Sequence, residues 1–413
     1  MAIENNISLR NKVLEVEQAK AIKKTATAEY LPSISVNSIA FSAQEPLYSI
    51  GVEDISNAQL RQMIQSWLFE YGGYYGLDDE FSILQNGVLA NVMAIQPLYA
   101  GGRIRNGNKM ASLGIEASIL QKDIAEKEVV QEVQCTYWQL IALDEKKKTI
   151  QKLTTLLDTL DKDVRSAIDA GLALPHDALK INLKKKECQL NEQKIDDGIM
   201  MLQMLLAHNM GLDTDDFMIS DTLTQQYPPE HYFVEANTAV ESRPESELLS
   251  LALRVEDLSK KMTLGETLPS LAIGASYSYN NLFDKTKFNG AVFAVLQIPI
   301  SDWYKTTASI KRHNLSIQIA ENNRVDLQSK MQLQTNQAWL ALQQSWHKIE
   351  LAADIVTQAE TNLKNTSDFY EAGIVTLSEV LEAQTSLQKC LNDYIDAKIE
   401  YQLQVIKYEQ ITQ

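Results

Sequence analysis

The chain has 413 residues, a formal net charge of −16, and 22% charged against 45% hydrophobic residues. An acidic balance of this size disfavours nucleic acid and anionic lipid headgroups as partners of the whole surface, and no basic tract reverses it. The three cysteines, Cys135, Cys188 and Cys390, lack metal-ligand spacing, so we interpret them as small packing residues.

The first elements in the chain are a helix and a strand. An amphipathic helix is predicted over residues 3–29, and a strand over about 31–42. No run of about 18 apolar residues is present, so no helix is expected to span a bilayer. The first residues do not have the pattern of a secretory signal, so the chain is expected to be either cytosolic or a mature form from which a signal has been removed. The strands described below favour the second interpretation.

A long insertion follows over residues 41–80, with a short helix expected around 58–69. Its aromatic residues, Trp67 and the cluster from Tyr71 to Tyr75, have two interpretations. They form either an interfacial aromatic belt or part of a loop over the mouth of a barrel. A second strand is predicted over about 81–98.

Residues 103–210 are predicted to form a long antiparallel helical hairpin. Its tip, 170–177, contains Gly171, a residue type that permits a left-handed helix end, and Pro175, which suits the first turn of the returning helix. An acidic and irregular connector spans 211–243.

The same order of elements then recurs. Strands are predicted at about 269–281 and 288–300, followed by a helical hairpin over 303–413 with its tip at 371–379. Landmarks in the two halves are separated by a constant 202 positions: Pro97 and Pro299, Gly171 and Gly373, Cys188 and Cys390. The chain is therefore interpreted as a tandem duplication, with repeats at 1–210 and 244–413.

The strand that begins near residue 270 has two chemically different faces. Ile273, Tyr277 and Tyr279 alternate with small residues such as Ser276 and Ser278. This pattern is typical of an outer-membrane barrel strand between lipid and a wet lumen, and equally of a soluble half-buried strand. Four strands leave two unpaired edges, which cannot lie in lipid, so a barrel requires several copies of the chain.

The order of elements resembles the TolC-type outer-membrane efflux proteins over nearly the whole chain. The resemblance is carried by the duplicated architecture and by the segments QPLYAGGR at 96–103 and IPISDW at 298–303. It implies a mixed α and β fold, in which a trimeric outer-membrane β-barrel with four strands per chain is continued by a long periplasmic α-helical barrel of antiparallel hairpins.

The resemblance also implies a function and partners. It implies a homotrimer in outer-membrane lipid that works with a periplasmic adaptor (a membrane fusion protein) and an inner-membrane transporter. The channel would be the exit duct of a tripartite efflux or type I secretion system for small molecules or drugs. The alternative is a soluble, elongated coiled-coil scaffold or periplasmic adaptor protein.

Candidate functional residues lie at the two hairpin tips. The resemblance implies that Glu379 and Glu382 form an acidic pore constriction, although carboxylates there also suit a solvated first turn of a helix. It further implies that Asp177 and Tyr370 make a contact that holds the entrance shut.

A second closing contact of the family, between an arginine and a threonine, is missing here because Val375 and His176 occupy those places. The resemblance assigns adaptor contact to both tips, although the two glycines would also serve as simple helix caps. The expected contact residues are Ala170, Gly171, Leu172, Ala372, Gly373 and Ile374.

Nothing in the sequence indicates an enzyme. The five histidines are scattered without an i, i+4 pair, and no nucleophile elbow or phosphate-binding loop is present. We therefore expect no catalytic residues, no cofactor and no metal site.

Overall fold

The computed structural model divides into two compact units, and each contains segments from both halves of the chain. The sheet unit consists of residues 21–112 and 255–316, and the hairpin unit of 1–20, 113–254 and 317–413. Within these, the structure describes 2–45, 48–75, 80–83, 86–171, 173–212, 223, 226–282, 285–300 and 303–412.

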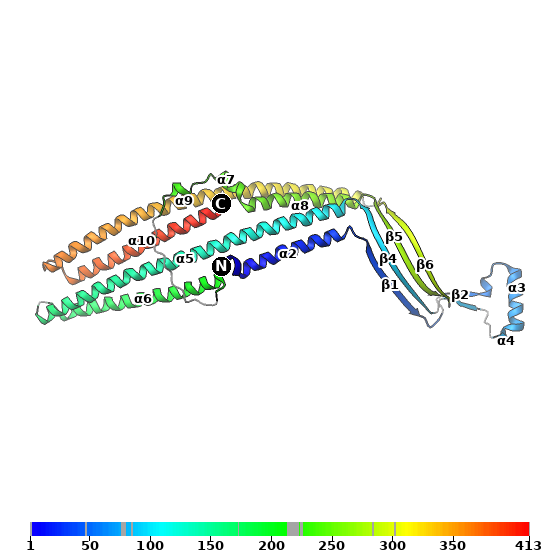
Figure 1. The fold of residues 1–413 in the computed structure, drawn as a ribbon, viewed down its shortest axis with the longest axis horizontal. Coiled ribbons are helices and arrows are strands. Elements are labelled where there is room, and N and C mark those ends of the chain that lie inside the picture. Colours follow the sequence, from blue (N-terminus) through cyan, green and yellow to red (C-terminus); the bar gives the residue numbers. More distant parts are fainter. Residues whose placement is uncertain are drawn as a thin grey trace. The chain divides into compact units, whose positions relative to one another are not determined.

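The sheet unit contains a four-stranded antiparallel sheet with the order β1-β4-β5-β6 (Figure 1). The strands are β1 (Ser33–Ser42), β4 (Asn86–Ala100), β5 (Ser270–Leu282) and β6 (Lys285–Gln297). The two halves of the chain meet where β4 pairs with β5, and β1 and β6 lie at the edges. The predicted mixed α and β fold with four strands is confirmed.

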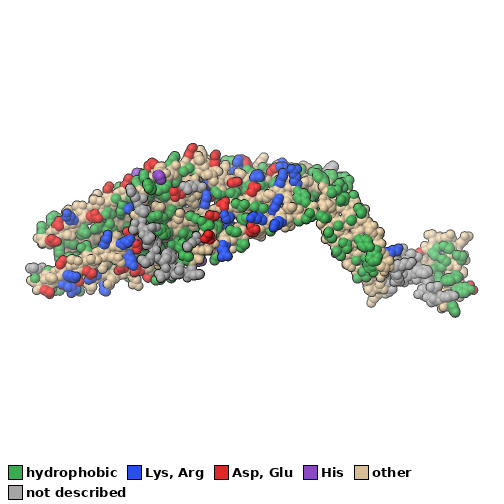
Figure 2. All heavy atoms as spheres, in the orientation of Figure 1, with side chains coloured by type: hydrophobic (Ala, Val, Ile, Leu, Met, Phe, Trp, Pro, Cys, Tyr) green, Lys and Arg blue, Asp and Glu red, His purple; other side chains and the backbone are tan. Residues whose placement is uncertain are grey.

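The register makes one face of this sheet richer in large apolar side chains than the other, which also exposes Ile39, Leu89 and Val295. Directly opposite residues in an antiparallel pair share a face, so the row Val36, Val92, Tyr277 lies on one side and the row Asn37, Asn91, Ser278, Asn289 lies on the other. On the first side, nine large apolar side chains are 37–87% exposed: Ile34, Val36, Val88, Val92, Ile273, Tyr277, Phe288, Val292 and Leu296. Figure 2 shows hydrophobic side chains covering the visible face of the sheet, whereas charged side chains are spread over the helices.

The insertion folds into elements of its own. A small hairpin pairs β2 (Tyr48–Gly51) with β3 (Glu80–Ile83), a pairing that sequence analysis did not predict. Between them lie η1 (Val52–Asp54), α3 (Ala58–Trp67), the π-helical η2 (Leu68–Gly72) and α4 (Gly73–Tyr75). The predicted helix near 58–69 is present. Phe69 and Tyr74 are 96% and 85% exposed, and neither interpretation of the aromatic cluster is tested.

Two glycines form the turn between β4 and α5. Gly101 and Gly102 have φ of 62° and 77°, in the left-handed region that side chains other than glycine rarely adopt. The backbone of Gly265 lies where a Cβ on Gly101 would point. The turn therefore requires glycine for both its conformation and its close backbone approach.

Long helices make up most of the chain. Helix α5 (Arg103–Asp169) and α9 (Trp303–Glu371) have 67 and 69 residues, and each is followed by a 36-residue returning helix, α6 (Pro175–Met210) or α10 (Leu377–Thr412). The shorter helices are α1 (Ala2–Asn5), α2 (Ile7–Ala28), η3 (Pro229–Tyr232), α7 (Ala236–Ser242) and α8 (Pro244–Glu266). Over the described residues, no helix has the length and apolar character needed to cross a membrane.

The core of the hairpin unit contains two clusters that matter for function. One is built around Tyr401 and Tyr408 of α10, with Trp339 and Trp346 packed against it. The other brings α5, α6 and α10 together near the hairpin tips. Its buried members are Ile150, Leu157, Val164, Ile181, Cys188, Leu377 and Leu381. The two hairpins thus share one apolar core near their turns.

Candidate functional site at the hairpin tips

The turn of the second hairpin is a Schellman motif. Ile374 N donates to Phe369 O and Gly373 N donates to Tyr370 O, both at 2.9 Å, with Gly373 at φ 75°. Ala372 is exposed, and Ile374 is 70% exposed. This geometry satisfies the last carbonyls of α9 and presents a short apolar tip. It accounts for Gly373 as a cap, and the predicted adaptor contact is not tested by it.

The turn of the first hairpin has the same glycine geometry. Gly171 has φ 76°, and its N–H donates to Ile168 O at 2.9 Å. Helix α6 then starts with Pro175 in its first turn, as predicted. Ala170 is exposed, whereas Leu172, also a predicted contact residue, lies outside the described residues.

The two predicted constriction carboxylates have different surroundings. Glu379 Oε2 accepts hydrogen bonds from Thr376 N at 2.6 Å and Thr376 Oγ1 at 2.9 Å, which is the arrangement of a helix N-terminal cap. The backbone hydrogen bond from Thr376, and then its side chain, hold the pKa of Glu379 below its usual value. Glu382 is exposed and lines a shallow groove of about 320 Å³ that also contains Lys180 and Lys184 of α6.

Asp177 lies in the first turn of α6, and Tyr370 lies at the end of α9 in the other hairpin. The Asp177 side chain is only 19% exposed, and its Oδ1 lies 3.3 Å from Lys180 Nζ and 3.4 Å from His176 Nε2. Tyr370 packs against the apolar cluster near the tips. Burial raises the pKa of the Tyr370 phenol, and the nearby negative charge of Asp177 raises it further. Among the described residues, no hydrogen bond joins the two side chains.

The other two predicted gate positions make no polar link across the hairpins. The His176 side chain is 54% exposed and approaches only its neighbour Asp177, while Val375 is half-buried. Sequence analysis missed Lys180, whose Nζ donates to Ser378 Oγ at 2.9 Å and so connects α6 with α10. Lys180 stands one helical turn after Asp177, but its partner is 198 positions away, which no local pattern indicates.

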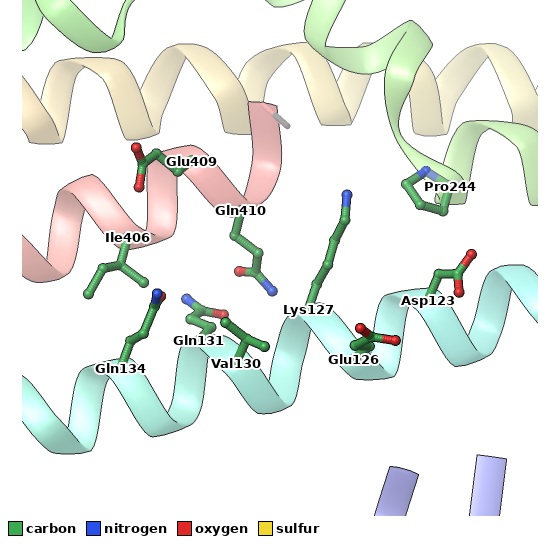
Figure 3. Close-up of a pocket in the computed structure, with 10 residues that line it drawn as sticks. All are labelled: Asp123, Glu126, Lys127, Val130, Gln131, Gln134, Pro244, Ile406, Glu409 and Gln410. Atoms are coloured by element: carbon green, nitrogen blue, oxygen red, sulfur yellow. The ribbon is translucent and has the colours of Figure 1, made fainter. Parts of the chain in front are cut away.

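Another groove in the hairpin unit lies farther from the tips. It has a volume of about 550 Å³ and lies between the middle of α5, the end of α10 and the first residue of α8, Pro244. Lys127 and Gln410 project into it from opposite sides, whereas Glu409 points away from α5 (Figure 3). Burial raises the pKa of Glu409. We assign no function to this groove.

A family model described as "outer membrane efflux protein" matches residues 243–412, the part that contains α8, β5, β6, α9 and α10. This match covers less than half of the chain and makes residues 243–412 similar to an outer membrane efflux protein domain. No curated protein sequence matches the chain. The predicted resemblance to TolC-type channels is confirmed by this domain and by the fold of the whole chain.

Solved structures share the fold of the outer membrane efflux domain and of the rest of the chain. A membrane protein from Pseudomonas aeruginosa has a TM-score of 0.79 at 15% identity, covering 100% of this chain and 91% of that one. The outer membrane protein VceC from Vibrio cholerae gives 0.77 at 14%, covering 100% and 94%. The CmeC outer membrane channel from Campylobacter jejuni gives 0.75 at 14%, covering 100% and 84%. Because the sequence identities are only 14–15%, these structures show similarity of fold alone.

Proposed function

We propose that the chain is one protomer of an outer-membrane efflux channel, the exit duct of a tripartite pump for small molecules or drugs. The observation that carries the proposal is the sheet, which has an exposed apolar face and two edge strands. The outer membrane efflux domain over 243–412 supports the same conclusion.

The sheet is suited to a barrel made from several copies. Its edge strands, β1 and β6, run in opposite directions, since each step in the order β1-β4-β5-β6 is antiparallel. The β6 edge of one copy can therefore pair antiparallel with the β1 edge of the next, which leaves no free edge in lipid. The apolar row faces lipid, and the Asn37–Asn91–Ser278–Asn289 row faces the lumen.

Helical surfaces also carry apolar residues that the described parts of the chain leave exposed. On α6, Leu179, Leu183 and Leu190 are 55–69% exposed, and on α9, Leu333 and Leu340 are 57% and 56% exposed. Spacings of four and seven residues place each set along one side of its helix. Packing of these stripes between neighbouring copies supports a closed ring, and the efflux family implies three copies.

The tip residues have roles in this assembly. Symmetry repeats Glu379 and Glu382 into rings of carboxylates that attract cations at the pore. The approach of Asp177 to Tyr370 keeps the entrance narrow. The tips at Gly171 and Gly373, with Ala170, Ala372 and Ile374, contact a periplasmic adaptor that links the channel to an inner-membrane transporter.

The state of the purified protein tests the proposal. The apolar sheet face predicts that the chain needs detergent to stay dispersed, and that its mass in detergent is that of three copies. If the protein is a channel, the purified protein should also conduct ions in planar bilayers. A monodisperse monomer in detergent-free buffer would instead favour a soluble coiled-coil scaffold.

A further inference from the structure

We propose that Lys180 is a positioning residue that ties the start of α6 to the start of α10 and so holds the two hairpin tips in register. The inference rests on the proposed function, because the tie acts at the entrance of the channel. It assigns a role to a residue that the sequence pattern did not single out.

The contacts of Lys180 join two elements that the chain does not connect locally. Its ammonium group donates to Ser378 Oγ at 2.9 Å and lies 3.3 Å from Asp177 Oδ1. An ammonium group has three N–H donors, so one lysine can serve both oxygens at once. Lys180 therefore connects Asp177 of its own helix, α6, with Ser378 of α10.

Apolar packing alone does not define how the two hairpins are aligned along their helix axes. Leu377 and Leu381 pack on the shared core, but apolar contact is non-directional, so it allows one hairpin to slide along the other. Above Ser378, Gln384 is 5% exposed, and its Oε1 has no hydrogen-bond partner in the described part of the chain. Grooves of about 220 and 290 Å³ adjoin Gln384 on its two sides. The seam between the hairpins thus has a buried amide oxygen without a described hydrogen-bond partner, flanked by grooves, directly above the link made by Lys180.

Further polar ties lie well away from the tip. Gln388 Nε2 donates to Thr149 Oγ1 at 2.9 Å, and Lys146 Nζ lies 2.6 Å from Asp396 Oδ1. From Ser378 to Gln388, about three turns of α10 have no other hydrogen bond or ion pair to α5 or α6 among the described residues. Lys180 is therefore the polar connection that sets the register of the tips.

Lys184 supplies a matched control. It lines the same groove as Lys180 and Glu382, but its Nζ lies 2.8 Å from Glu187 on its own helix. Replacing either lysine by methionine removes one positive charge from the same groove. Only Lys180→Met removes a connection between the hairpins, so a difference between the variants is not a general charge effect.

The first measurement is single-channel conductance in planar bilayers. Lys180→Met and Ser378→Ala should each raise the open fraction about two- to five-fold, the range expected for a partly exposed polar pair. The double variant should match Lys180→Met, because the hydrogen bond between positions 180 and 378 is already lost in that single variant. Ser378→Asp should act in the opposite direction and lower the open fraction, since it turns the link into an ion pair. Lys184→Met should behave as wild type.

Hydrogen exchange of the detergent-solubilised full chain tests the tie without relying on conduction. Lys180→Met should speed exchange in the first turns of α6 and α10 together, and Ser378→Asp should slow it there. Equal exchange in wild type, Lys180→Met and Ser378→Asp would overturn the inference. If the wild-type protein does not conduct but the variants show the expected changes in hydrogen exchange, the result would count against the channel function. It would still support the link made by Lys180.

Discussion

Glu379 Oε2 accepts a 2.6 Å hydrogen bond from the backbone N–H of Thr376, three residues earlier. The carboxylate proposed to line the pore is therefore also the cap of the helix that carries it. Because the bond fixes the side chain at the helix start, the position of its negative charge relative to the tip is defined. This coupling between local structure and charge placement leads to the first two predictions.

Glu379→Gln combined with Glu382→Gln should lower the cation selectivity of the channel, because it removes two carboxylates per copy from the tips. Glutamine at position 379 keeps an oxygen that can accept from Thr376 N, so helix α10 should stay intact. Reversal potentials under a salt gradient measure the effect. Unchanged potentials in a normally folded double variant would remove the carboxylate ring from the proposal.

The cap also predicts a pH dependence. The hydrogen bonds from Thr376 favour the ionised form of Glu379 and lower the pKa of this carboxyl group. The ionised carboxylate therefore contributes fully to the stability of the fold above the unfolded-state pKa. This contribution is lost as the pH falls through the lower folded-state pKa. In the Glu382→Gln background, cation selectivity should therefore persist to a lower pH than an ordinary glutamate would allow. Thr376→Ala removes the hydroxyl bond and should shift this loss to higher pH. Identical pH profiles with and without Thr376→Ala would contradict the assignment.

If Asp177 and Tyr370 make the proposed closing contact, loosening it should widen the entrance. Asp177→Ala removes the charge that Lys180 and His176 approach, and Tyr370→Phe removes the phenol near it. Both variants should conduct more than wild type in planar bilayers. Tyr394→Phe is the control, because Tyr394 lies higher on α10 with Lys398 Nζ 4.9 Å from its ring centre. Wild-type conductance in both tip variants would argue against a closing contact.

Two tyrosines on α10 hold the connector in place. Tyr401 Oη donates to Tyr227 O at 2.5 Å, and Tyr408 Oη donates to Val234 O at 3.1 Å and accepts from Val234 N at 3.2 Å. Tyr401→Phe and Tyr408→Phe should each cost about 1 kcal/mol, because each removes a part-buried hydrogen bond to a backbone group. Limited proteolysis of the connector around 226–235 should become faster, and thermal unfolding should occur at a lower temperature. A connector cleaved at the wild-type rate in both variants would show that other contacts hold it.

Adjacent residues of β6 distinguish a lipid-facing sheet from a solvated one. Val292 is 87% exposed on the apolar face, and Ala291 points to the opposite face beside Ser276. In a barrel, Val292→Lys should destabilise the assembly by up to about 2–4 kcal/mol, whereas Ala291→Lys should be tolerated. Assembly in detergent and insertion into vesicles measure both. Equal tolerance of the two lysines would indicate that this face contacts water.

Part of the site could be predicted from local patterns. Thr376 and Glu379 have the spacing of a capping box, and Gly171 and Gly373 mark the left-handed helix ends that the structure contains. The partner of Lys180 could not be predicted, because Ser378 lies in the other hairpin. The β2–β3 hairpin was also missed, since two four-residue strands are too short to show a periodic pattern.

The sequence by itself determined the elements: two long helical hairpins, their glycine turns, and strands with one apolar face. These follow from short-range physics, in which side-chain spacing and backbone preference act within a few residues. Only the tertiary structure decided that β4 pairs with β5 across the two halves and that Lys180 reaches Ser378. Those relationships depend on packing between segments far apart in the chain, which local patterns do not encode.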